Sequence, residues 1–231
     1  MVSPDGQEIA FTREFQGSQQ DLWTLHVNLP GSQKLVARLP NRFNTVLCWS
    51  ADGHGVLIRS QGTDTQQDLQ LVTLGDSARV RPLLATRFNE PTGAISLDGK
   101  WLAYISDESG SYECRVRPFP AVEGPVQVVS RGAWTDPNAS GRIGEPVWRR
   151  DGRKLMYAAA DGRTLMSVTV TPGNPLTFGE PRRMFRLSSA VTDMVASPDL
   201  DRFILSITRD EEGRPTATVI LNWPRLLENA K

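Results

Sequence analysis

The sequence predicts an all-β fold built from about five four-stranded antiparallel units. Three observations lead to this prediction. One motif recurs along the whole chain, its period suits four strands with their turns, and apart from residues 225–231 no stretch of ten residues keeps the 3.6-residue period of a helix. Without helices between the strands, the parallel sheet of an α/β protein is excluded.

The recurring motif is Ser-Pro-Asp-Gly or a variant of it, followed each time by an apolar run. Its aspartates lie 47, 46, 53 and 48 residues apart, at Asp5, Asp52, Asp98, Asp151 and Asp199. A second marker keeps the same period, because a glycine follows each of these aspartates after ten to fourteen residues, at Gly17, Gly62, Gly110, Gly162 and Gly213. Repeats of 40 to 50 residues are typical of propeller blades.

Each unit is interpreted as strand, Asp-Gly turn, strand, glycine-containing turn, strand, loop and strand. Asp-Gly favours a two-residue hairpin turn, so we expect these aspartates to bond their own backbone rather than a ligand. The second strands are continuous apolar runs, as in 101–105, which indicates burial on both faces. A blade stacked between two other blades has that burial, so the sequence predicts a β-propeller.

We expect a single β-propeller domain over residues 1–231, of which residues 225–231 form a C-terminal tail. The approximate blades are 1–41, 42–88, 89–131, 143–187 and 190–224. The sequence begins inside the first turn motif and ends after the third strand of the last blade, which predicts an incomplete, open or truncated, propeller. Leu200 stands where the motif has glycine, so the sequence leaves the geometry of the last turn open.

Composition excludes some partners. Lys plus Arg (26) equals Asp plus Glu (26), so no net positive charge is available for nucleic acid or an anionic membrane. No apolar run approaches the length of a membrane span, which predicts no direct membrane insertion. The two cysteines, Cys48 and Cys114, lack the spacing of a disulfide framework or zinc site, and we expect buried thiols.

Motifs for catalysis were sought and were not found in the sequence. There is no glycine-rich phosphate loop with His-Arg-Asp and Asp-Phe-Gly, and the segment 75–79 fails the nucleophile motif Gly-x-Ser-x-Gly at its last position. His26 and His54 both precede that segment, and structural roles are expected for them. We therefore expect no catalytic residue, no metal ligand and no cofactor, although a channel calcium held by scattered carboxylates stays open.

Several segments resemble a known family. Residues 96–110 and 148–157 resemble the repeats of TolB-type, WD-like propellers, and 112–120 with 219–223 are similar to the C-terminal propellers of bacterial membrane-tethered serine/threonine protein kinases. The resemblance implies the sensor or scaffold end of a larger bacterial signalling or envelope protein, without a kinase domain in this chain. It implies a periplasmic location for a tethered parent and a cytoplasmic one for the sequence as written, which shows no signal peptide or transmembrane segment.

The predicted contact site is the long connection 131–146. Trp134 is the expected anchor for a partner, with Asp136 and Arg142 as polar contacts, while packing of Trp134 on its own blade is the alternative. We expect a protein or small ligand as partner, with self-association through open blade edges as a further option. The rival function is a propeller hydrolase or lactonase with a site in the central channel, and a third reading is a truncated array without independent function.

Overall fold

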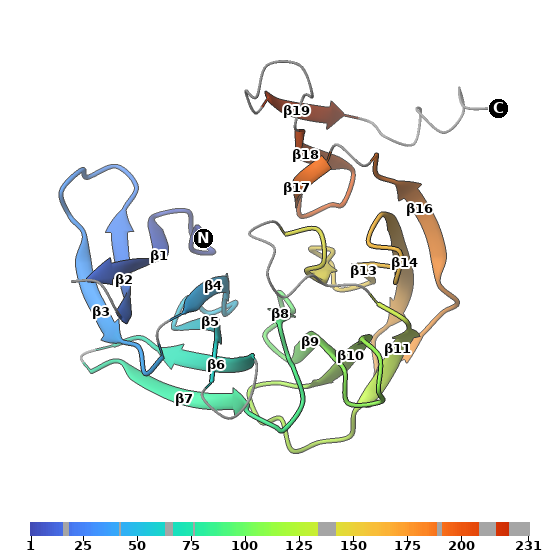
Figure 1. Ribbon diagram of the computed structural model, residues 1–231, viewed down its shortest axis with the longest axis horizontal. Helices are drawn as coiled ribbons and strands as arrows, with labels where there is room; N and C mark the ends of the chain where they lie inside the picture. Colours follow the sequence, from blue (N-terminus) through green and yellow to red (C-terminus); the bar gives the residue numbers. More distant parts are fainter. Residues whose placement is uncertain are drawn as a thin grey trace. The chain divides into compact units, whose positions relative to one another are not determined.

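The computed structural model describes residues 1–15, 19–41, 43–62, 67–75, 77–133, 142–188, 191–207 and 216–221. Strands, and no helices, are the regular elements of this part of the chain, and they form five antiparallel sheets (Figure 1). The all-β prediction is therefore confirmed, with one sheet for each of the five recurrences of the turn motif.

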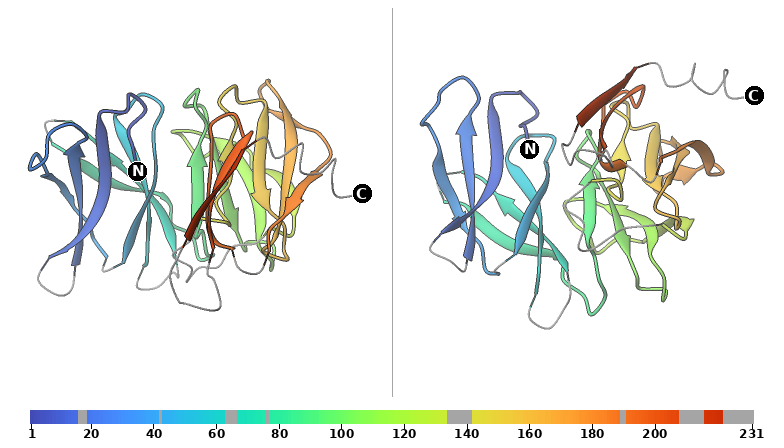
Figure 2. Two further views of the ribbon diagram at one scale, coloured as in Figure 1. Left: turned by 90° about the horizontal axis from the view of Figure 1, so that it is seen from above. Right: turned by 45° about the horizontal axis from the view of Figure 1, so that its top comes forward.

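The strands of each sheet follow one another along the chain, joined by hairpins (Figure 2). The first sheet contains β1 (Glu8–Phe15), β2 (Gln19–His26) and β3 (Lys34–Arg38). The second contains β4 (Asn44–Trp49), β5 (Gly55–Ser60), β6 (Asp68–Thr73) and β7 (Arg79–Leu84). The third contains β8 (Thr92–Ile95), β9 (Trp101–Ser106), β10 (Glu113–Pro118) and β11 (Gln127–Arg131).

The first sheet, with three strands, and the last two sheets depart from the four-stranded pattern. The fourth contains β12 (Val147–Trp148), β13 (Lys154–Ala158), β14 (Thr164–Thr171), β15 (Thr177–Phe178) and β16 (Arg182–Arg186), and both β15 and β16 pair with β14. The fifth contains β17 (Val191–Ala196), β18 (Arg202–Ile207) and β19 (Thr216–Leu221). The chain divides into two compact units, residues 1–111 with 115–127 and residues 112–114 with 128–231. A single domain over the whole chain stays a prediction.

Each sheet has two faces, because successive side chains of a strand point to opposite sides. We call the face that carries Leu102 and Tyr104 of β9 the upstream face, and the face that carries Ala103 the downstream face. The matching upstream positions in the other sheets are Ile9 and Phe11, Val56 and Ile58, Leu155 and Tyr157, and Phe203 and Leu205. The matching downstream positions are Ala10, Leu57, Met156 and Ile204.

The core lies between stacked sheets, and the upstream face of one sheet packs against the downstream face of the sheet before it. In the first unit, Ala10 and Leu22 of the first sheet cluster with Val56 and Ile58 of the second. The same arrangement recurs between the second and third sheets, where Leu57 and Leu71 meet Leu102 and Tyr104. Such stacking explains why the apolar run of the second sheet is buried on both faces.

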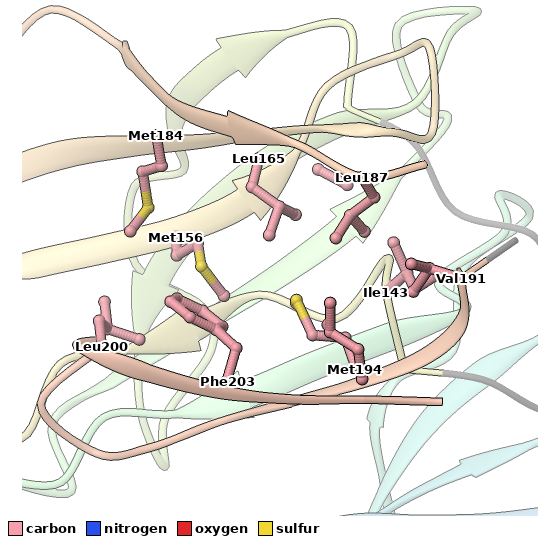
Figure 3. Close-up of a cluster of buried hydrophobic side chains, with 11 residues drawn as sticks. Ile143, Met156, Leu165, Met184, Leu187, Val191, Met194, Leu200 and Phe203 are labelled. Atoms are coloured by element: carbon pink, nitrogen blue, oxygen red, sulfur yellow. The ribbon is translucent and has the colours of Figure 1, made fainter. Parts of the chain in front are cut away.

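In the second unit, the fourth and fifth sheets repeat this arrangement (Figure 3). Met156 and Leu165 face Phe203 and Met194 across the interface, and all four side chains are at most 2% exposed. The ring of Phe203 meets the ring of Phe185 edge to face, with a centroid distance of 4.9 Å.

The turn motifs make the local hydrogen bonds that the sequence predicts. Ser96 donates its hydroxyl to Asp98 Oδ1 at 2.6 Å, and the same oxygen accepts the backbone N–H of Lys100 at 3.1 Å. Ser3 with Asp5 and Ser50 with Asp52 repeat this geometry at 2.6 and 2.5 Å. The motif aspartates of these turns therefore form turns, as expected.

Leu200 keeps the turn geometry of the motif although it is not glycine. Its φ is +61°, and the glycines at the matching positions have φ of +76°, +73°, +68° and +68°, at Gly6, Gly53, Gly99 and Gly152. The Leu200 N–H donates to Ser197 O at 2.9 Å, as in the other turns. The Leu200 side chain is 2% exposed and belongs to the core of the second unit. Burial of leucine thus offsets the strain of a left-handed backbone.

We expect Leu200→Gly to destabilise the protein even though glycine suits this backbone. The left-handed conformation costs leucine about 1–2 kcal/mol, whereas removing a buried leucine side chain costs about 3–5 kcal/mol. The expected net loss is about 2 kcal/mol in the free energy of unfolding, measured by urea denaturation. Gly99→Ala, where the added methyl group meets nothing nearer than 3.7 Å, isolates the backbone cost alone. An unchanged or raised stability of Leu200→Gly would contradict this balance.

Candidate functional site

An open groove lies between the first and second sheets, at the end that carries the turn motifs. Its volume is about 340 Å³, within the range of small-ligand sites. Glu8, Lys34, Leu35 and Val36 line it from the first sheet, and Leu74 and Ala78 line it from the second.

The two charged side chains of the groove form a long, exposed ion pair. Lys34 Nζ lies 3.8 Å from Glu8 Oε1, and the two side chains are 67% and 33% exposed. An exposed ion pair of this kind contributes little to stability, about 0–1 kcal/mol. Val36 and Leu74 are half-buried in the same groove, so apolar surface lies beside the Lys34 ammonium group. The groove can hold an apolar group and a carboxylate at once.

A buried glutamate is the second chemically distinct feature. Glu90 precedes β8, is 2% exposed, and accepts a hydrogen bond from Thr86 Oγ1 at 2.7 Å. Burial, with a smaller contribution from the negative charges of Asp68 and Asp107, raises the pKa of Glu90 to about 7. Within the part of the chain that the structure describes, Glu90 Oε2 has no hydrogen-bond partner.

The chain topology brings these carboxylates together. Asp68 begins β6, Asp107 follows β9, and Glu90 lies in the connection between the second and third sheets. Asp107 Oδ1 accepts the backbone N–H of Asn89 at 2.8 Å, and the Glu90 N–H donates to Gln67 O at 2.8 Å. Across the described ranges, however, no three or more His, Cys, Asp or Glu side chains are arranged to hold a metal ion.

Of the predicted contact residues, Trp134 and Asp136 lie outside the described residues. Arg142 is described, and its own chain holds it: the Arg142 Nε donates to Glu145 Oε2 at 2.7 Å, and its backbone N–H donates to Asp193 Oδ1 at 2.6 Å. The contact role of this connection stays a prediction. Neither the groove nor the Glu90 group was found from the sequence, because their residues come from separate elements and share no spacing.

The two histidines lie next to hydrogen bonds within their own turns, and the two cysteines are free thiols. His26 Nδ1 accepts the backbone N–H of Asn28 at 3.3 Å, and the backbone N–H of His54 donates to Asp52 Oδ1 at 2.9 Å. Both cysteines are free thiols, Cys48 half-buried and Cys114 fully buried. Burial raises the pKa of Cys114 to about 12, so this thiol stays protonated and unreactive.

No helix among the described residues combines the length and the apolar character that crossing a membrane requires.

Comparison with known proteins finds likeness in structure but not in sequence. No family model and no curated protein matches the chain. Among solved structures, TolB from Acinetobacter baumannii superposes with a TM-score of 0.57 at 16% identity, over 80% of this chain and 42% of TolB. This chain therefore spans less than half the length of that protein.

Two further solved structures show that the similar proteins are diverse. A nidogen/laminin complex chain gives a TM-score of 0.63 at 9% identity, covering 94% of this chain and 72% of that one. Puromycin hydrolase gives 0.61 at 13% identity, covering 95% of this chain and 35% of the hydrolase. The similar structures are TolB-like and other β-propeller proteins, with and without enzyme activity. At identities of 9 to 16% the likeness shows the fold alone, and the chain has the β-propeller fold.

Proposed function

We propose that this chain is a non-catalytic propeller module that binds a protein segment or small ligand, and that the groove between the first and second sheets is its binding site. The observation that carries the proposal is the combination of apolar lining and one exposed lysine in a groove of ligand size. The groove fits a short apolar group that ends in a carboxylate, such as the C-terminal residue of a peptide.

The physical argument rests on exchange of ion-pair partners. Because the Lys34–Glu8 pair is long and exposed, replacing Glu8 by a ligand carboxylate costs little. The new pair would form beside Val36 and Leu74, where apolar surface excludes part of the water and strengthens the charge interaction. Burial of the ligand's apolar group supplies the remaining free energy.

N-acetyl-leucine tests this proposal, with N-acetyl-leucinamide as the matched uncharged probe. By typical ligand efficiency we expect a Kd on the order of 1 mM for the acid, measured by chemical-shift changes in a ¹⁵N-labelled sample. The amide should bind about fivefold more weakly, because it lacks the charge that pairs with Lys34.

Variants locate the site. Lys34→Gln should reduce the affinity for N-acetyl-leucine to that for the amide, and Ala78→Trp, which fills the groove, should abolish binding of both. Lys100→Gln changes another exposed lysine, outside the groove, and should bind like the parent protein. Equal binding of acid and amide, or unaltered binding by Lys34→Gln, would show that the groove does not recognise carboxylates.

A hydrolase is the second candidate, and Glu90 is the observation that favours it. A carboxyl group with a pKa near neutrality can act as a general acid or base. Its burial weighs against this role, since a side chain that is 2% exposed cannot reach a substrate without rearrangement. Hydrolysis of p-nitrophenyl acetate or an acyl-homoserine lactone that is lost in Glu90→Gln would favour the hydrolase over the binding module.

The wider setting of the module is also part of this proposal. The similarity of 112–120 and 219–223 to kinase-linked propellers supports a role as the sensor end of a membrane-tethered signalling protein. The coding DNA upstream of Met1 tests it: an in-frame transmembrane segment and kinase motifs would support the sensor role, and an in-frame stop codon would contradict it.

A further inference from the structure

Two sheet faces depart from the burial rule of the stacked sheets. The upstream positions of the second to fifth sheets are at most 4% exposed, and the downstream positions of the first to fourth sheets are fully buried. The upstream face of the first sheet and the downstream face of the fifth do not follow this rule. They are called the first-sheet face and the last-sheet face below.

The first-sheet face is apolar across all three of its strands. Ile9 pairs with Leu25 and Phe11 with Trp23 across β1 and β2, and Leu35 of β3 is opposite Trp23. The first four side chains are half-buried and Leu35 is 41% exposed, whereas the matching positions of inner sheets are closed. The guanidinium of Arg13 lies 5.4 Å from the Trp23 ring and covers part of this face.

The last-sheet face carries a pair of exposed apolar side chains. Val195 of β17 and Ile204 of β18 are directly opposite in the antiparallel register, and they are 43% and 47% exposed. Their strand neighbours Met194 and Leu205 point to the other face and are buried in the core of the second unit. The exposed pair therefore belongs to a paired sheet and not to a loop.

We propose that the last-sheet face of one copy of this chain packs against the first-sheet face of a second copy. Wherever two sheets stack within either unit, an upstream face meets a downstream face. The first-sheet face is an upstream face and the last-sheet face is a downstream face. They can therefore pack together as the upstream and downstream faces of neighbouring sheets do within each unit. A second copy continues the stacking that the chain already uses.

This contact is heterologous, because the two copies use different surfaces. A heterologous contact leaves one face free at each end of a dimer, so association continues until a ring closes or filaments form. Sedimentation velocity should therefore show the 25.6 kDa chain shifting to twice that mass or more as its concentration rises. A monomer at every concentration would overturn the proposal.

Complementary variants test which faces meet. Phe11→Arg blocks the first-sheet face and Ile204→Glu blocks the last-sheet face, so each variant alone should be monomeric. Their one-to-one mixture should form a dimer and stop there, since one intact face of each kind remains. Leu29→Arg and Val128→Glu charge other exposed apolar residues, at 60% and 48% exposure, and should associate like the parent.

Two other results of the variant experiment would indicate a different contact between the copies. Association of Ile204→Glu alone, with Phe11→Arg monomeric, would indicate two first-sheet faces meeting symmetrically and would overturn the proposal. Failure of the mixture to dimerise would do the same. Circular dichroism melting curves check that each variant folds; Leu25→Arg and Val195→Glu replace a variant that does not.

Discussion

Phe203→Ala should lower the free energy of unfolding by about 3–5 kcal/mol, the usual cost of removing a fully buried aromatic ring. Phe203 is 1% exposed and lies between Met156, Met194 and the ring of Phe185. The fifth sheet is stacked on one face only and can relax toward the cavity, so we expect the lower part of this range. Urea denaturation followed by far-ultraviolet circular dichroism measures the loss.

Ile204→Ala is the matched control, one residue further along the same strand. Ile204 is 47% exposed, so its truncation should change stability by about 1 kcal/mol or less. Both proteins are measured at low concentration, where association is absent. Similar losses for Phe203→Ala and Ile204→Ala would show that the last sheet is covered on both faces, against the structure.

Glu90→Gln should stabilise the protein at about pH 8 and leave its stability nearly unchanged at about pH 5, with a difference on the order of 2 kcal/mol. Glutamine resembles the protonated carboxyl group and can still accept the hydrogen bond from Thr86. It therefore removes the cost of holding a negative charge in a buried position beside Asp68 and Asp107.

The sign follows from the raised pKa. Burial raises the pKa of Glu90 from 4.5 to about 7, so the folded protein binds the proton more tightly than the unfolded chain. Stability is full below the unfolded pKa, falls as the pH rises between the two values, and stays at its lower level above about pH 7. The parent protein should show this fall, and Glu90→Gln should lack this contribution.

Urea denaturation across this pH range measures both proteins, and the difference between them removes every contribution to the pH dependence that the two proteins share. Glu14→Gln changes an exposed glutamate of β1 and should follow the parent protein at each pH. If the stabilities of parent and Glu90→Gln run parallel from about pH 5 to about pH 8, Glu90 does not carry the raised pKa.

Much of the candidate site could not be predicted, because its residues meet only through stacking of sheets. Lys34 and Leu74 are forty residues apart and line one groove. Glu90 looks like an ordinary loop glutamate in the sequence, since its pKa depends on burial and on two distant aspartates. The connection around Trp134 was predicted from the longer step between two turn motifs and from its turn-forming residues, and its contact role stays a prediction.

The sequence by itself determined the repeated unit. Turn chemistry is local: Asp98 and Gly99 define their hairpin with atoms a few residues away, so the motif predicts strand, turn and strand wherever it occurs. The period of the motif then predicts the number of sheets, and the equality of positive and negative charges argues against polyanion partners. These inferences depend only on neighbours in the chain.

Only the tertiary structure decided which apolar side chains are covered. Leu102 and Ala103 of β9, and Phe203 and Ile204 of β18, look alike in the sequence as members of continuous apolar runs. In the structure the first three are at most 1% exposed, while Ile204 is 47% exposed. The hydrophobicity of a side chain shows that burial is favourable for it. Burial also requires a partner surface, and that surface comes from residues far along the chain or from another molecule.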